Sequence, residues 1–318
     1  MRGTRRGLVL LSVLLLLWAA AGHAFYRLDH GHDAEGYRLL AELAAHKADL
    51  ADDIDGPRVL IAGGSNAYYG LDAAAIEKRL GVPVLNLALP FGAHHHEIAL
   101  DMLEEQVQHG DVVVFSSGGA WEPTRPPSRR AREFDAYLAE IGFPDYRRRF
   151  SEPPLPWRAL PETGPLVLAA AESFGSEPGR SWIADTDDRG TFVACRTAPV
   201  VLPRHYGSDA VNTELAAALR REAGRLREQG IRLTVALPWL YIRETDRKRW
   251  AEFRIRFVQA VASSVPVIGS DAGTLLHSER DKFCDSPLHL SSQASQRRSE
   301  IVAEALKPLV AAARQARR

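Results

Sequence analysis

Short runs of apolar residues alternate with longer amphipathic segments along much of this 318-residue chain. The runs are too short for buried helices and most lie close to glycine or proline, as buried strands do. Each intervening segment is long enough to carry the chain back to the same edge of a sheet. The five runs are residues 58–62, 82–87, 111–116, 231–237 and 265–268. This rhythm predicts an α/β fold with three α/β/α layers around a mainly parallel five-stranded sheet.

The segments between these runs have the features of helices. Asp72 is expected to cap a helix that continues to residue 80, and Gly81 is expected to end it. Further helices are expected over residues 97–109, 212–229, 245–263 and 295–312. In the last of these, the residues expected to face the core are Ile301, Ala305 and Leu309.

The N-terminus has the pattern of an export segment. A basic start precedes an uncharged run from Leu8 to Ala21, and small residues suited to a signal peptidase follow at Gly22 and Ala24. The run is short for a membrane span, although adding its neighbours nearly reaches the required length. Residues 1–24 are therefore expected to be either a cleaved signal peptide or an uncleaved membrane anchor. Both alternatives place the rest of the chain outside the cytoplasm.

The remainder divides into a short N-terminal part and one large domain. Residues 25–56 are interpreted as a helical stalk or as an N-terminal helix packed on the domain. The domain is expected over 57–318, with a large irregular insertion at about 119–206 that is rich in proline. Insertions of this length in α/β enzymes commonly form a lid or a substrate groove. Its three tryptophans, which either stack on sugar rings or fill the local core, are Trp121, Trp157 and Trp182.

Composition excludes several classes of function. Basic and acidic residues balance at 40 each, so no overall field favours nucleic acid. No phosphate-binding or dinucleotide fingerprint occurs, and no cofactor is expected. His94, His95 and His96 are adjacent and cannot all face one metal ion, so we expect one to line a site rim and no metal. Cys195 and Cys284 suit an exported protein and could form one disulfide or remain two part-buried thiols.

Ser65 is the strongest candidate for chemistry. It lies in Gly-Gly-Ser-Asn, directly after the first apolar run, while Asp285 and His289 lie close together near the C-terminus. Because loops that follow parallel strands meet at one edge of the sheet, these side chains are expected to converge. Serine, histidine and aspartate together carry out nucleophilic acyl chemistry. The turn taken alone could instead be a helix cap or a phosphate-binding turn.

The order of these motifs resembles the SGNH hydrolase superfamily, the GDSL-type esterases and acyltransferases. Gly63 to Asn66 resembles the first block of that family, Asn86 to Gly92 the second, and Asp285 to His289 the last. The resemblance covers roughly residues 57–318 in separate pieces. It implies a flavodoxin-like sheet and a catalytic triad.

The resemblance also assigns roles. Ser65 would be the nucleophile, His289 the general base and Asp285 the acid that orients it. Backbone N–H groups of Ser65 and Gly92 would bind the oxyanion. Independently of the resemblance, Cys284 immediately precedes Asp285, so a disulfide with Cys195 would brace this loop against the insertion.

The chain departs from the family pattern in several places. The third block, Ser116 to Ala120, lacks the asparagine that normally completes the oxyanion hole, so Gly118, Gly119 or Asn66 would have to complete it. The remaining departures are Gly64 in place of aspartate, a spacing of four from Asp285 to His289, and Ala294 in place of glycine. These departures are typical of membrane-anchored relatives that acylate cell-surface polymers, such as the alginate O-acetylation and teichoic-acid D-alanylation types.

The resemblance implies O-acyl transfer or ester hydrolysis on a cell-surface or exported polysaccharide. The expected partners are a glycan or acyl-ester substrate, an integral membrane O-acyltransferase, and the membrane through the N-terminal segment, with no nucleic acid. The expected location is the periplasm, tethered to the inner membrane, or outside the cell if the leader is cleaved. The alternative is a non-catalytic component that binds glycan or scaffolds an envelope polysaccharide export or modification complex.

Overall fold

The computed structural model describes residues 43–90, 96–121, 186–192, 200, 211–269 and 271–316. All of them belong to one compact unit, Glu42–Ala131 together with Trp182–Arg318. The expectations for the leader and for most of the insertion, including Trp157 and Trp182, lie outside the described residues. Gly92, His94, His95 and Cys195 lie outside them as well.

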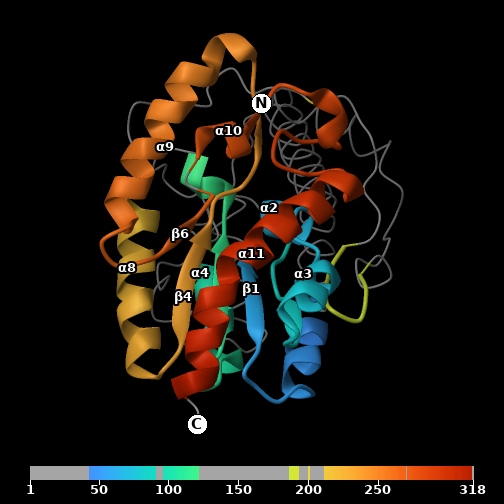
Figure 1. Cartoon of the computed structure of the whole chain (residues 1–318), viewed down its shortest axis with the longest axis vertical. Coiled ribbons are helices and arrows are strands. Elements are labelled where there is room, and N and C mark those ends of the chain that lie inside the picture. Colours follow the sequence, from blue (N-terminus) through green and yellow to red (C-terminus); the bar gives the residue numbers. More distant parts are fainter. Residues whose placement is uncertain are drawn as a thin grey trace, which may run out of the picture. The chain divides into compact units, whose positions relative to one another are not determined.

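A five-stranded, entirely parallel sheet forms the centre of this unit (Figure 1). Its strands follow the order β2-β1-β3-β4-β6, so the chain begins near the middle and winds outward in both directions. The strand bounds are β1 Val59–Gly63, β2 Val84–Asn86, β3 Val112–Ser116, β4 Arg232–Ala236 and β6 Val267–Ile268. The predicted fold class is confirmed, and each strand falls within or beside its predicted run.

Helices cover both faces of the sheet. Right-handed crossovers along this strand order place α3 on one face and the helices that lead to β3, β4 and β6 on the other. The contacts agree, because α11 packs on α3 while α8 packs on both α4 and α9. The helix bounds are α3 Ala73–Leu80, α4 His96–Gln106, α8 Thr213–Glu228, α9 Arg247–Val261 and α11 Ser292–Ala316.

Two helix starts show why the sequence folds as it does locally. The Asp72 side chain accepts a hydrogen bond from the Ala75 N–H at 2.9 Å, as predicted for the cap of α3. Asn212 accepts from the Leu215 N–H at 2.9 Å and caps α8 in the same way. Leu215, Leu219 and Leu226, which recur on one face of α8, are completely buried.

The core-facing residues of α11 correct the sequence prediction. Ile301, Ala305 and Leu309 are not buried, and the buried apolar positions include Val302 and Leu306. The helix also begins at Ser292, earlier than predicted. Polar residues occupy its inward positions in the early turns, so the apolar pattern alone sets the wrong register. The inward polar residues are Ser295, Arg298 and Ser299.

A helix at residues 43–52 precedes the sheet. Leu43 and Ala51 are completely buried, so this helix packs on the domain. Lys47, between them, is also completely buried. A lysine in that position is costly unless its ammonium finds acceptors.

Shorter elements connect the main ones. A small parallel sheet pairs β5 with β7, and the sequence did not predict it. The bounds are α2 Ser65–Tyr68, η1 Gly118–Trp121, β5 Leu240–Tyr241, η4 Glu244–Asp246, α10 Ala272–Leu275, β7 Leu276–His277 and η5 Arg280–Lys282. Within the described ranges, no helix is both long enough and apolar enough to cross a lipid bilayer.

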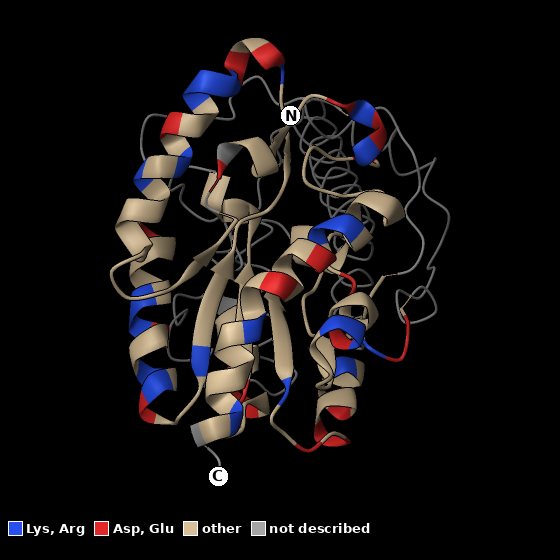
Figure 2. Ribbon diagram, in the orientation of Figure 1, with Lys and Arg blue, Asp and Glu red and all other residues tan. Residues whose placement is uncertain are grey.

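Trp121 belongs to the core. It is 1% exposed, its ring packs against Trp250 and Phe253, and its indole N–H donates to the Pro238 carbonyl at 3.0 Å. The structure therefore selects local packing over sugar stacking for this tryptophan. Charged residues lie mainly on the helices, while the strands are uncharged along most of their length (Figure 2).

Candidate active site

The turn that carries Ser65 is tightly built against the neighbouring strand. Gly63 ends β1 with φ of 138°, and a Cβ there would lie 1.8 Å from the Ser116 carbonyl oxygen. The next N–H, that of Gly64, donates to the same Ser116 oxygen at 3.3 Å. Ser65 is the first residue of α2 and is partly exposed, whereas Gly64 and Asn66 are buried. The fold thus presents one serine at the carboxyl edge of the sheet.

Backbone donors surround this turn. The N–H groups of Ser65, Asn66 and Gly118 have no hydrogen-bond partner within the described residues. Gly118 follows the end of β3, the strand next to β1, and it is buried. Buried N–H groups rarely stay unpaired in proteins, so donors of this kind suit an oxygen atom of a ligand.

Two other candidates for the oxyanion hole already have partners. The Asn66 side-chain amide donates to Ser116 Oγ at 2.8 Å and is 1% exposed. The Gly119 N–H donates to Ser117 Oγ at 3.1 Å. Among the replacements suggested for the missing asparagine, the backbone N–H groups of Gly118 and Asn66 are unpaired donors within the described residues. Gly92 lies outside the described residues.

Asp285 and His289 are directly hydrogen-bonded. His289 Nδ1 lies 2.7 Å from Asp285 Oδ1. An ionised carboxylate only accepts, so Nδ1 carries the proton and Nε2 is left as an acceptor. This bond is the largest cause that holds the pKa of Asp285 below its usual value, against the opposing effect of burial. The pair has the arrangement of a base and its orienting acid.

The loop that holds this pair is closed at its base. Phe283 and Leu290 form an antiparallel bridge, and the Cys284 N–H donates to the His289 carbonyl at 2.9 Å. The His289 N–H donates to the Ser286 carbonyl at 3.3 Å. These bonds fold the loop so that a spacing of four residues still brings the carboxylate onto the imidazole.

Tyr69 contacts both the Ser65 turn and His289. Its N–H donates to the Ser65 carbonyl at 2.8 Å, one helical turn along the chain. Its ring lies 4.3 Å from the His289 ring, centroid to centroid. No hydrogen bond joins Ser65 and His289 directly; within the described part of the chain Tyr69 makes the connection. Phe192, from the end of the insertion, packs on the other side of Tyr69 at 4.7 Å.

Lys47 supports the segment that follows β2. Its ammonium donates to the carbonyls of Asn86, Ala88 and Gly190 at 2.6 to 2.8 Å. It also lies 4.6 Å from the centre of the Tyr68 ring, a cation–π contact. Burial lowers the pKa of Lys47 well below its usual value, and the charge of Asp187 opposes that effect. Sequence reasoning missed this residue because a lysine in a polar helix looks like a surface residue.

Arg298 was also missed. It is 1% exposed, and its guanidinium donates to Ser116 Oγ at 2.7 Å and to the Asn66 carbonyl at 3.2 Å. In the sequence, Arg297 and Arg298 look like two adjacent surface arginines. The only available signal was that Ser295, Arg298 and Ser299 repeat at helical spacing.

The remaining candidates stand as follows. Cys284 is disulfide-bonded and 1% exposed, while Cys195, the other cysteine of the sequence, lies outside the described residues. His96 begins α4 and is 9% exposed. Within the described residues, no group of three histidine, cysteine or acidic side chains is arranged to hold a metal ion.

Comparisons with known proteins add no assignment. No protein-family model matches the chain, and no curated protein matches it significantly in sequence.

Proposed function

We propose that this protein is a serine esterase or O-acyltransferase of the SGNH type that acts on ester groups of an exported or cell-surface polysaccharide. The observation that carries the proposal is the Asp285–His289 hydrogen bond at 2.7 Å, with the His289 ring in contact with Tyr69 one turn beyond Ser65. A serine on a turn after a parallel strand and a histidine oriented by a carboxylate are the groups that acyl transfer uses.

In the first half-reaction, Ser65 Oγ attacks the carbonyl carbon of an acyl ester while His289 Nε2 takes the hydroxyl proton. A C–O bond forms, and the negative charge moves to the former carbonyl oxygen. The N–H groups of Ser65 and Gly118 donate to that oxygen. The intermediate then breaks the bond to the leaving alkoxide, which takes the proton from His289 and departs as an alcohol.

In the second half-reaction, an acceptor hydroxyl gives its proton to His289 and attacks acyl-Ser65. The acyl–serine bond breaks, and Ser65 recovers its proton from His289. Water as the acceptor gives an esterase, and a sugar hydroxyl gives a transferase. Asp285 keeps Nδ1 protonated throughout and stabilises the imidazolium.

Reaction of the full-length purified protein with a chromogenic acetyl ester tests this proposal. We expect a burst of product followed by slower turnover, with an acetyl group found on Ser65 by mass spectrometry. Ser65→Ala should remove both. Normal turnover by the folded Ser65→Ala protein would show that the nucleophile is elsewhere. Added oligosaccharide separates the two acceptors, because a transferase forms an acylated sugar.

A second candidate has one observation in its favour. Ser65 and His289 are not hydrogen-bonded to each other, as they would be in a fully assembled triad, although such bonds are often loose without substrate. A non-catalytic glycan-binding or scaffold protein would bind oligosaccharide in solution and show no burst. In cells, its Ser65→Ala variant would leave glycan acylation unchanged.

The proposed location is outside the cytoplasm, next to an integral membrane O-acyltransferase that supplies acyl groups in the transferase version. The basic and apolar pattern of residues 1–24 supports this location. Crosslinking in intact cells, with the full chain and with a chain whose leader is replaced, tests for the membrane partner. We expect the chain with the replaced leader to be no longer exported, and therefore to lose the crosslink to the membrane partner.

A further inference from the structure

Arg298 lies beneath the Ser65 turn. The residue belongs to an early turn of α11, and its guanidinium reaches three separate segments at the carboxyl edge of the sheet. The acceptors on the Ser65 turn are the carbonyls of Asn66 at 3.2 Å and Gly70 at 3.3 Å. The acceptor on β3 is Ser116 Oγ at 2.7 Å. The carbonyls of Ala236 and Leu237, at the end of β4, lie at 3.4 and 3.2 Å.

The Ser65 turn is shaped to admit this guanidinium. A Cβ on Gly70 would lie 2.8 Å from Arg298 Nη1 and 2.3 Å from the Asn66 carbonyl oxygen. Any other residue at position 70 would therefore push the guanidinium away. Ser116 Oγ receives Arg298 on one side and the Asn66 amide at 2.8 Å on the other. Arg298, Ser116 and Asn66 thus form a connected network next to the nucleophile.

The charge of Arg298 is not neutralised locally. Among the described residues no carboxylate lies within ion-pair distance of it, and its Nε has no hydrogen-bond partner. Burial lowers its pKa to about 9, so the group stays protonated at neutral pH. A buried cation without a counter-ion costs stability, and an apolar side chain of similar size is often better tolerated. Its five hydrogen bonds offset part of that cost and leave one unneutralised charge beneath the Ser65 turn.

We propose that Arg298 is a positioning residue for the chemistry at Ser65. Its guanidinium ties the Ser65 turn to the ends of β3 and β4, so that the N–H groups of Ser65 and Gly118 face the same point. Its uncompensated positive charge lies behind those donors and favours negative charge on an oxygen bound there. This inference rests on the proposed function, since it concerns the same site.

The experiment compares four full-length proteins: the wild type, Arg298→Met, Arg298→Lys and Arg297→Met. Arg297 is the matched control, because it is the adjacent arginine of α11 and its side chain is 69% exposed. Two readouts are used, the rate at which a fluorophosphonate probe labels Ser65, and kcat and KM for a chromogenic acetyl ester. Near-ultraviolet circular dichroism and a urea titration establish that each variant is folded.

For Arg298→Met we expect labelling and kcat to fall by about 100-fold with KM nearly unchanged, the size of effect seen when an oxyanion donor is lost. Arg298→Lys should recover part of the rate, because it restores the charge without the fork of donors. Arg297→Met should match the wild type. A folded Arg298→Met protein that reacts at the wild-type rate would overturn the proposal. A raised KM with unchanged kcat would also overturn it, by making Arg298 a ground-state binding residue.

A second variant covers the case in which Arg298→Met does not fold. Ser116→Ala leaves Arg298 in place and removes the hydroxyl that joins it to Asn66. We expect about a 10-fold slower labelling of Ser65. Labelling at the wild-type rate would contradict the positioning role. If the wild type itself fails to label at Ser65, the proposed function fails first, and that result is distinct from equal labelling of wild type and variants.

Discussion

Buried charged side chains have different partners at the two edges of the sheet. At the amino edge, Arg58 precedes β1 and Asp111 precedes β3; their side chains form a fully buried ion pair at 2.9 Å. The Asp111 carboxylate also accepts from the backbone N–H groups of Arg58 and Gln108, each at 2.9 Å. At the carboxyl edge, Lys47 and Arg298 are equally buried but contact neutral oxygens.

This difference leaves the amino edge with a neutral ion pair and the carboxyl edge with a buried positive charge. The Arg58–Asp111 pair at the amino edge is neutral overall and leaves little field outside. The Arg298 guanidinium at the carboxyl edge leaves a buried positive charge next to the Ser65 turn and the end of β3. A positive field favours an anionic transition state, which is the role that the proposed function would give to the charge at the carboxyl edge.

The largest effect should come from Asp285→Asn at the carboxyl edge. An asparagine cannot hold the His289 tautomer, so reaction at Ser65 should slow by about 10⁴-fold. Because the Asp285 side chain is half exposed, the urea midpoint should hardly move. Labelling kinetics and urea titration of the same sample measure both quantities. A large loss of stability with little loss of rate would remove the distinction between the two edges.

Asp111→Ala should have the largest effect on stability. It leaves the buried Arg58 charge unpaired, and the free energy of unfolding should fall by about 3–5 kcal/mol. Reaction of the folded fraction with the fluorophosphonate should be unchanged. The double variant Arg58→Met/Asp111→Leu is the control, because it removes both charges and should recover much of the loss. Failure of the double variant to recover would assign the loss to packing rather than to the unpaired charge.

Lys47→Met should cost less stability than Asp111→Ala. The change removes a buried charge but leaves three carbonyl oxygens without their donor, for a net loss of about 1–2 kcal/mol. The difference should depend on pH. Between the lowered pKa of folded Lys47 and its usual 10.5, the unfolded chain holds a proton that the folded protein does not, so wild-type stability rises with pH in this window. Lys47→Met should lack that rise.

Urea titrations of both proteins at neutral pH and near pH 10.5 measure the difference. We expect the gap between wild type and variant to widen as the pH rises. A gap that is constant across the window would mean that folded Lys47 titrates at its usual value.

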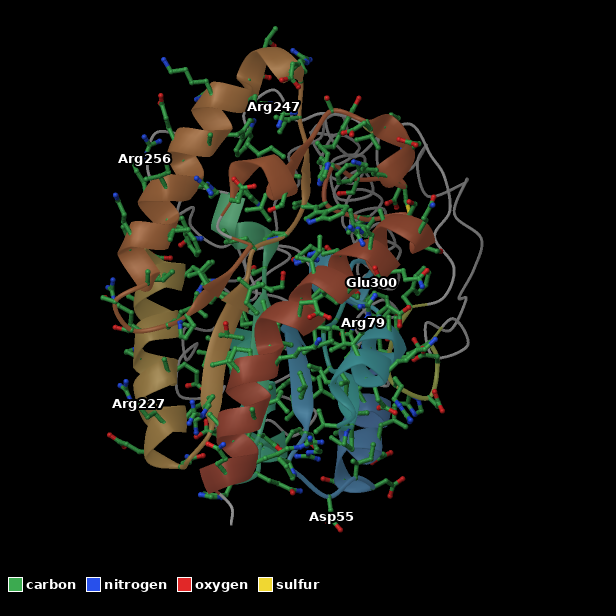
Figure 3. The ribbon with its side chains drawn as sticks, viewed as in Figure 1. Asp55, Arg79, Arg227, Arg247, Arg256 and Glu300 are labelled. Atoms are coloured by element: carbon green, nitrogen blue, oxygen red, sulfur yellow. The ribbon has the colours of Figure 1, made fainter. Side chains whose placement is uncertain are left out.

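Arg79→Met should have the smallest effect. Arg79 on α3 forms ion pairs with Glu300 and Glu304 on α11, and all three side chains are partly exposed to water (Figure 3). Exposed pairs of this kind contribute little, because water and salt screen them. Neither the urea midpoint nor the labelling rate should change measurably. A clear loss of rate would show that α11 transmits surface changes to Arg298.

The strands, the Asp72 cap and the start of α8 could be predicted because they depend on local patterns. Five apolar runs identified the sheet, and Asp72 and Asn212 begin the helices that follow them as expected. The Asp285–His289 contact could also be predicted, since both residues lie in one short loop. These features depend on neighbours in sequence, and one chain contains that information.

The two buried cations could not be predicted because their partners are distant carbonyl oxygens. Lys47 lies 39 residues or more from each carbonyl that it contacts, and Arg298 lies 61 residues or more from its acceptors. Main-chain oxygens are present at every position, so no residue type marks an acceptor. The polar start of α11 then shifted the predicted core-facing stripe by one residue. Sequence patterns identify apolar burial far better than they identify buried charge.

Gly63 has a consequence for the ancestry of this domain. Its lack of a side chain is demanded by the approach of β1 to Ser116, whether or not the neighbouring Ser65 reacts. Natural selection on the fold would therefore preserve this glycine even in descendants that had lost their chemistry. A lineage that became a pure binding protein should keep Gly63 while it accumulates substitutions at Ser65, Asp285 and Arg298. If the proposed chemistry is correct, loss of these three residues with the glycine kept would mark a lineage that no longer reacts at Ser65.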